Sequence, residues 1–335
     1  MSFPMSSLLF FFSLLSGTFL SISSPSWFGA WLGLELNLLS FIPLITIKMS
    51  SYLSEAAIKY FLVQALASTV IIMASSLSLI FPDFSFVLIL LALILKVGAA
   101  PFHFWFPQIM EGLSWPQAIV LMTIQKIAPM FLISYLTTTH ILTNIIILVG
   151  IMSALIGALG GLNVMKLRKL MAFSSINHMS WMLISISVND TMWMVYFLFY
   201  TVISSSVILF LHSTQSFSFS DLLNSGRIEY IITLILPMSL LSLGGLPPFS
   251  GFLPKWIMIQ LLISNGMLVP LVFLLFSSLL TLYFYIRILV PFILTNSPLL
   301  SFNIKNLNSP KGLLFPMLSI FNIFGLFLPI PFLMF

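Results

Sequence analysis

The chain has 335 residues, of which 60% are hydrophobic and only 6% are charged, and its formal net charge is +5. A soluble domain carries about 25% charged residues, so this composition excludes a soluble globular protein and indicates a polytopic membrane protein. The basic residues are dispersed, which leaves no basic stripe for nucleic acid. The sequence has no cysteine, which excludes disulfides, thiolate zinc sites and the usual iron–sulfur clusters.

Hydropathy divides the chain into about eleven apolar spans that are long enough to cross a bilayer. No Lys or Arg precedes Lys48, so we expect a retained first span rather than a signal or transit peptide. The sequence therefore predicts an all-α polytopic membrane protein without a soluble domain. The expected limits of the spans are 5–22, 26–46, 57–81, 84–106, 115–137, 141–162, 170–188, 190–213, 228–263, 267–294 and 312–333.

Lysine and arginine gather in the loops on one side of the predicted membrane. If the N-terminus faces that side, no basic residue falls in the loops on the other side. The positive-inside rule then places the N-terminus on the cytoplasm-like side, which is the matrix if the organelle is a mitochondrion, and the C-terminus on the opposite side, which would then be the intermembrane space. The basic loop residues are Lys48, Lys166, Arg168, Lys169, Arg227, Lys305 and Lys311.

Two of the spans are interrupted beside a lysine. The fourth meets Gly98 and Pro101 directly after Lys96, and the ninth contains GGLPPFSG shortly before Lys255. Both patterns predict a broken helix, although the second also fits a re-entrant piece. Because the breaks are five spans apart, an odd number, they predict two inverted five-helix repeats with two discontinuous helices. The repeats would occupy 1–140 and 141–294, followed by a loop and a terminal helix at 295–335.

Five ionisable residues are expected deep in the membrane. Lys126 lies near the centre of its span, roughly 15 Å from either end, which is farther than a lysine side chain snorkels. Glu35 lies in mid-span, and His178 lies in a serine-rich segment. We expect a proton path in which Glu35 pairs with Lys96. Lys126 would carry the proton between Lys96 and Lys255, with His178 as a further relay.

Each of these residues also has a structural interpretation. A Glu35–Lys96 salt bridge could serve only to orient helices, and Lys126 could simply pair with a carboxylate or with carbonyls. His178 could be a core histidine that is bonded to a neighbouring helix. His103 follows the first break and fits either a relay or an interfacial residue.

Five segments carry a family resemblance: LGLELNLLSF, LKVGAAPFHFWFPQIMEG, IQKIAPM, MAFSSINHMSW and LSLGGLPPFSGFLPKW. They resemble the NADH dehydrogenase subunit 2 family, the mitochondrial antiporter-like subunits of respiratory complex I, and the resemblance covers nearly the whole chain. It implies two inverted five-helix repeats with discontinuous helices, in the animal form that lacks three N-terminal helices of bacterial relatives. It also implies that the family's functional glutamate and lysines fall on Glu35, Lys96, Lys126 and Lys255, and its polar histidine helix on His178.

The resemblance implies a core membrane-arm subunit of the proton-pumping NADH:ubiquinone oxidoreductase in the mitochondrial inner membrane. FMN, the iron–sulfur clusters and ubiquinone would be bound by other subunits, so no cofactor is expected in this chain. The expected partners are other membrane-arm subunits, including neighbouring antiporter-like and small hydrophobic ones, and membrane lipids.

Two alternative functions stay open: a free-standing cation/proton antiporter of the same fold, and a structural membrane-arm scaffold without pumping of its own. An antiporter would need several acidic groups near the midplane, whereas Glu35 alone is expected at that depth.

Overall fold

The computed structural model describes residues 5–47, 50–137, 139–224 and 230–295. Within these ranges, seven helices are long and apolar enough to cross a membrane, so the expectation of an all-α multi-pass membrane protein is confirmed. The chain divides into two compact units, Met1–Met152 and Ser153–Phe335. Each unit is described by itself. The predicted boundary between repeats after residue 140 stays a prediction.

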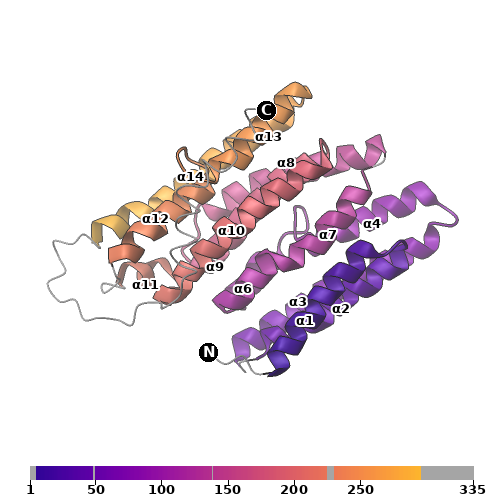
Figure 1. Ribbon diagram of the computed structural model, residues 1–335, viewed down its shortest axis with the longest axis horizontal. Helices are drawn as coiled ribbons and strands as arrows, with labels where there is room; N and C mark the ends of the chain where they lie inside the picture. Colours follow the sequence, from indigo (N-terminus) through magenta and orange to yellow (C-terminus); the bar gives the residue numbers. More distant parts are fainter. Residues whose placement is uncertain (1–4, 48–49, 138, 225–229, 296–335) are drawn as a thin grey trace. The chain divides into compact units, whose positions relative to one another are not determined.

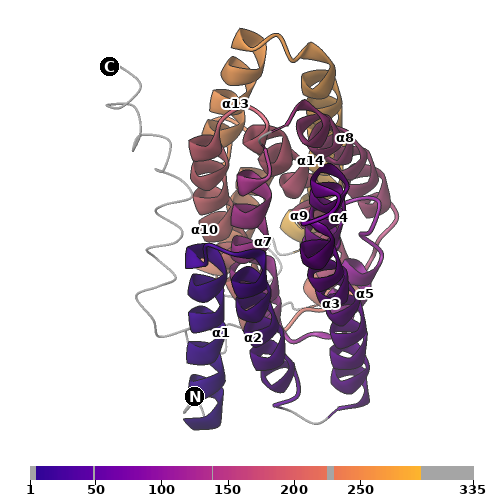
Figure 2. The ribbon, with the colours of Figure 1, turned by 90° about the vertical axis from the view of Figure 1, so that its right-hand side faces the viewer.

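The first unit contains seven helices among its described residues, and helix α8 (His140–Gly161) runs from it into the second unit. Figure 1 shows α1, α2 and α3 running side by side, and Figure 2 shows α5 beside α3. The helices are α1 (Met5–Ser23), α2 (Trp27–Ile45), α3 (Ser51–Leu77), α4 (Pro82–Val97), α5 (Trp105–Gly112), α6 (Trp115–Met122) and α7 (Ile124–Tyr135).

Helices α1 and α2 pack so closely that their backbones touch at two glycines. A Cβ atom on Gly33 would lie 2.4 Å from the amide nitrogen of Ser21 and 2.7 Å from the carbonyl oxygen of Gly17. Neither is the end of a flexible side chain, so only a residue without a Cβ fits. Small residues of this kind let membrane helices approach closely and gain van der Waals packing.

We expect Gly33→Ala to destabilise the protein by about 1–3 kcal/mol, because the added methyl group forces the two backbones apart. The measurement is the melting temperature of the purified protein in detergent, with Leu32→Ala as the control because the Leu32 side chain is exposed on the same helix. An unchanged melting temperature for Gly33→Ala would show that the α1–α2 contact relaxes freely.

The second unit contains a further six helices among its described residues. Helix α9 lies against α10, and α14 lies against α12 and α13 (Figure 1). The helices are α9 (Leu167–Ile186), α10 (Asp190–Thr214), α11 (Phe219–Asn224), α12 (Tyr230–Gly244), α13 (Phe252–Ser264) and α14 (Leu268–Thr295).

The two predicted breaks are present and share one backbone pattern. Helix α4 ends before Gly98 (φ 76°), and helix α12 ends before Gly245 (φ 79°), both in the left-handed region that glycine adopts without strain. In each case the glycine N–H bonds the carbonyls three and four residues back. The next residue bonds the carbonyl five residues back, which is the Schellman pattern of a helix end. The second break therefore separates two helices.

The fifth predicted span differs from the expectation, because it too is interrupted. Thr123 leaves the helical conformation (φ −112°, ψ −80°) and separates α6 from α7. Pro129, inside α7, has no N–H to offer the carbonyl of Gln125, which weakens the helix at this point. Lys126 therefore lies in the first turn of a helix and not in the middle of one.

Other differences concern boundaries. The third helix begins at Ser51, six residues before the predicted start, because the Ser50 side chain caps it by accepting from the N–H of Leu53 at 3.3 Å. Each of the first ten predicted spans carries at least one described helix, whereas α11 and most of α5 lie between predicted spans. The eleventh span and the basic residues Lys48, Arg227, Lys305 and Lys311 lie outside the described residues, so the count of eleven stays a prediction.

Candidate functional site

The break after α4 holds Lys96 at the end of a helix whose last carbonyls are satisfied by side chains. The indole N–H of Trp105 donates to the carbonyl of Leu95 at 3.0 Å, and the amide of Gln64 donates to the carbonyl of Lys96 at 3.2 Å. A helix C-terminus carries partial negative charge, which stabilises a nearby cation. The break thus creates a polar environment for a lysine that is only 6% exposed.

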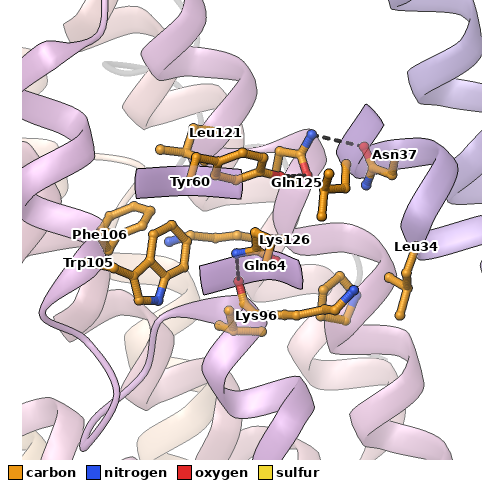
Figure 3. A pocket seen from close by; sticks show the side chains of 13 residues that line it. Leu34, Asn37, Tyr60, Gln64, Lys96, Trp105, Phe106, Leu121, Gln125 and Lys126 are labelled. Carbon is orange, nitrogen blue, oxygen red and sulfur yellow. Dashed lines mark hydrogen bonds between the residues drawn. The ribbon is translucent and has the colours of Figure 1, made fainter. Parts of the chain in front are cut away.

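Lys96 and Lys126 line the same internal cavity. The centre of a water molecule can occupy about 10 Å³ of it, which is room for about one water. In Figure 3 the Lys96 side chain extends toward α2, whereas the Lys126 side chain extends toward Phe106. The lining comes from α2 to α7 and consists of Leu34, Asn37, Leu38, Tyr60, Gln64, Lys96, Val97, Trp105, Phe106, Leu121, Gln125, Lys126 and Pro129.

Lys126 is 2% exposed, and its ammonium lies 4.9 Å from the centre of the Phe106 ring. A cation at that distance is attracted by the face of the ring. Phe106 belongs to α5, directly after the first break. The same break therefore shapes the surroundings of both lysines of the cavity.

Hydrogen bonds between uncharged polar side chains join three of the helices that line the cavity. The Gln125 amide donates to Asn37 Oδ1 at 2.9 Å and accepts from the Tyr60 hydroxyl at 3.0 Å (Figure 3). These residues lie on α7, α2 and α3. Sequence reasoning missed this network and Gln64. The sequence did contain a sign of these residues, because each is a polar side chain inside an apolar span. Such polar residues, like charged ones, indicate functional positions in membrane proteins.

Glu35 lies beside this cavity, and its side chain is half-buried. Its carboxylate is close enough to act electrostatically on Lys96 and on the Tyr60 hydroxyl. Glu35 and Lys96, both described residues, make no N–O contact within 4.0 Å. The Oε2 atom of Glu35 is buried without a hydrogen-bond partner among the described residues. The predicted pair is thus a through-space interaction and not a direct salt bridge.

Lys255 lies in the first turn of α13, in the second unit. Its ammonium donates to the carbonyl of Gly244 at 2.8 Å, at the C-terminal end of α12. A Cβ atom on Gly245 would lie 2.7 Å from Cδ and 2.8 Å from Nζ of Lys255, so the glycine leaves the space that the side chain fills. Lys255 follows its break, whereas Lys96 precedes its own.

His178 is buried in the second unit, where its Nδ1 lies 3.0 Å from the hydroxyl of Tyr196. The nearby serines donate hydrogen bonds to backbone carbonyls of their own helix. Ser174 donates to the carbonyl of Met171 at 2.8 Å, and Ser175 donates to that of Ala172 at 2.7 Å. The Tyr196 hydroxyl that contacts His178 comes from a neighbouring helix, α10. His103 lies in the first break, with Nδ1 3.2 Å from the carbonyl of Pro101.

Within the described ranges, no group of three or more His, Cys, Asp or Glu is placed to hold a metal ion. The structure groups the predicted residues by unit: Glu35, Lys96 and Lys126 lie around the cavity of the first unit, and Lys255 and His178 lie in the second.

Comparison with known proteins gives the family. A family model described as NADH:quinone oxidoreductase/Mrp antiporter, TM matches residues 24–83 and 77–281. NADH-ubiquinone oxidoreductase chain 2 of Anopheles gambiae is 47% identical over 326 residues, which cover 93% of this chain and 94% of that protein. The chain belongs to the NADH-ubiquinone oxidoreductase chain 2 family. Another member, from Aedes aegypti, is 46% identical over 288 residues and 83% of each chain.

A solved structure agrees with the fold of the chain 2 family. A chain of respiratory complex I from Thermus thermophilus, solved with bound aureothin, superposes with a TM-score of 0.84. The match covers 99% of this chain and 81% of that one at 22% identity. The family resemblance drawn from the five sequence segments is confirmed.

Proposed function

We propose that this chain is a core membrane-arm subunit of NADH:ubiquinone oxidoreductase and that it moves protons through the cavity of its first unit. The observation that carries the proposal is the pair of buried lysines, Lys96 and Lys126, that line one small polar cavity. A buried lysine changes protonation state readily, because burial disfavours its charged form and a nearby carboxylate favours it. Glu35 supplies that carboxylate beside Lys96.

The helix ends give the two lysines opposite surroundings. Lys96 lies in the last turn of α4, where the helix dipole favours a cation. Lys126 lies in the first turn of α7, where the dipole disfavours one. The two helix dipoles therefore act on the two ammonium groups in opposite directions. A change of charge near Glu35 acts on Lys96 and would move a proton between the two lysines.

The proposal includes the wider arrangement expected from the sequence. The matched breaks at Gly98 and Gly245 support two inverted five-helix repeats. The chain would lie in the mitochondrial inner membrane with its N-terminus on the matrix side, among other antiporter-like and small hydrophobic subunits. Lys255 and His178 would continue the path in the second unit. FMN, iron–sulfur clusters and ubiquinone would be bound by other subunits.

The test is Lys96→Met in the assembled enzyme, with proton translocation and NADH:quinone turnover measured in sealed vesicles. We expect translocation to fall by about 100-fold or more, because a positioned proton-transfer group contributes about 10²–10⁴ in rate. The matched control is Lys59→Met, since Lys59 is an exposed lysine that pairs with Glu55 at 2.6 Å.

Three outcomes separate the candidate functions. Loss of translocation in an assembled Lys96→Met enzyme, with a normal Lys59→Met control, supports the proposal. Normal translocation would leave the scaffold as the better description. A chain that purifies alone, without flavin or other subunits, and exchanges cations for protons would instead be the free-standing antiporter.

A further inference from the structure

The interrupted helix that contains Lys126 is bonded to α2 separately on each side of its break. On the α6 side, the Gln117 amide donates to the carbonyls of the last two residues of α2, at 2.7 and 3.0 Å. On the α7 side, the Gln125 amide donates to Asn37 Oδ1, in the middle of α2, at 2.9 Å. Each glutamine therefore holds one half of the interrupted helix.

Gln125 is the residue directly before Lys126, in the first turn of α7. Its amide is bonded at both ends, because Oε1 also accepts from the Tyr60 hydroxyl of α3 at 3.0 Å. Asn37 and Tyr60 are only 3% and 2% exposed, so the side chains around them keep both partners in place. The start of α7 is thus held from two sides, by α2 and by α3.

The backbone holds the start of α7 only weakly. Thr123 leaves the helical conformation, and its hydroxyl donates back to the carbonyl of Ile119 in α6 at 2.7 Å instead of capping α7. Pro129 has no N–H to offer the carbonyl of Gln125. The Gln125 side chain is therefore well placed to determine where the first turn of α7 lies.

The same residues border the cavity that Lys126 lines. Asn37, Tyr60 and Gln125 all face its space for about one water (Figure 3). The Lys126 ammonium lies 4.9 Å from the centre of the Phe106 ring, so a shift of the first turn of α7 would move it relative to both the ring and the cavity. A misplacement of about 1 Å can lower the rate of a reaction by about 100-fold.

We propose that Gln125 is a positioning residue for proton transfer, whose hydrogen bonds to Asn37 and Tyr60 hold Lys126 at the cavity. This inference rests on the proposed function. Gln125 does not itself take up or release the proton, because its amide is an uncharged donor and acceptor. It acts only through Lys126, by fixing where the ammonium lies.

The test is Gln125→Met in the assembled enzyme in sealed vesicles, because methionine is close to glutamine in size but does not replace its amide. We expect proton translocation to fall by about tenfold to 100-fold. The pH dependence of the rate should also shift, because Lys126 then titrates in changed surroundings. The matched control is Gln108→Met, since Gln108 is an exposed glutamine on α5, and it should translocate normally.

The pH profile separates positioning from mere support of the fold. It reports the titratable groups that adjoin the cavity, which are Lys126 of α7, Glu35 of α2, Tyr60 of α3 and Lys96 of α4. Gln117→Met removes the bonds of α6 to α2, so it should lower the melting temperature and leave the pH profile unchanged. An equal shift of the pH profile in Gln117→Met and Gln125→Met would overturn the positioning role.

Tyr60→Phe tests the second hydrogen bond of Gln125 and keeps the ring. Alone, it should lower translocation by less than Gln125→Met does, because it removes one of two bonds. Combined with Gln125→Met, it should be no slower than Gln125→Met alone, and additive losses would overturn the shared role. If Gln125→Met does not assemble, a normal rate and pH profile in Tyr60→Phe would overturn the proposal.

The inference and the proposed function fail in different ways. A normal Gln125→Met enzyme beside an impaired Lys126→Met enzyme would overturn the positioning role and leave the proposed function intact. Normal translocation in both Lys96→Met and Lys126→Met would instead refute the proposed function.

Discussion

Replacing Lys126 with arginine should stop proton translocation as completely as replacing it with methionine. Arginine keeps the positive charge but does not give up its proton in proteins. A lysine that serves only as a fixed charge beside Phe106 would tolerate this change, whereas a lysine that releases a proton would not. We expect both variants to lose about 100-fold or more of the translocation rate. The measurement is proton translocation and quinone turnover of the assembled enzyme in sealed vesicles.

Arginine is larger than lysine, and the cavity beside Lys126 has room for only about one water, so the steric fit of Lys126→Arg has to be checked separately. The amount of assembled enzyme and its melting temperature show whether Lys126→Arg is accommodated. Lys59→Arg, on the exposed part of α3, controls for the substitution itself. An assembled Lys126→Arg enzyme that pumps normally while Lys126→Met does not would contradict the carrier role and leave Lys126 as a structural charge.

The largest structural effect is expected from Gly251→Ala in the second break. A Cβ atom on Gly251 would lie 1.7 Å from the carbonyl oxygen of Ser242 and 2.8 Å from its carbon. Both are backbone atoms of α12, so the connection from Gly245 to Gly251 has to move as a whole. The loss of stability should exceed the usual 1–3 kcal/mol of an overpacked core. We expect little or no assembled enzyme, measured by its yield from membranes.

Gly244→Ala is the matched control for this prediction. Gly244 is the last residue of α12, and a Cβ atom there would approach Leu282 and Tyr285 no closer than 3.7 Å, which is ordinary van der Waals contact. The variant should assemble normally. If Gly251→Ala also assembled with an unchanged melting temperature, the close packing of the break against α12 would be disproved.

The sequence predicts the two broken helices because glycine and proline act locally. Gly98 and Gly245 each end a helix through their own backbone conformation, which needs no distant partner. The interruption at Thr123 was missed because Thr123 is an ordinary residue in a helix. Pro129 frees only the carbonyl of Gln125, inside α7, so the sequence gives no local sign that the backbone is interrupted at Thr123.

The sequence predicts the candidate site only where a single residue is unusual for its surroundings. Lys96, Lys126 and Glu35 stand out because a charge within an apolar span is rare. The network of Asn37, Tyr60 and Gln125 joins residues up to 88 positions apart, and a single sequence gives no sign of such contacts. The contact between Tyr196 and His178 was missed for the same reason, since tyrosine is common in membrane helices and only packing shows which side chains meet.

The small size of the first-unit cavity has a consequence for the membrane as a whole. One elementary charge that crosses 100 mV releases about 2.3 kcal/mol, so a continuous file of water through the subunit would short-circuit the potential that the respiratory chain builds. A space for about one water, lined in part by Trp105 and Phe106, interrupts such a file. Under the proposed function, the side chains that shelter the two lysines would therefore also insulate the membrane. Each transfer would then need a brief widening of this space, which would keep the leak through a resting subunit small.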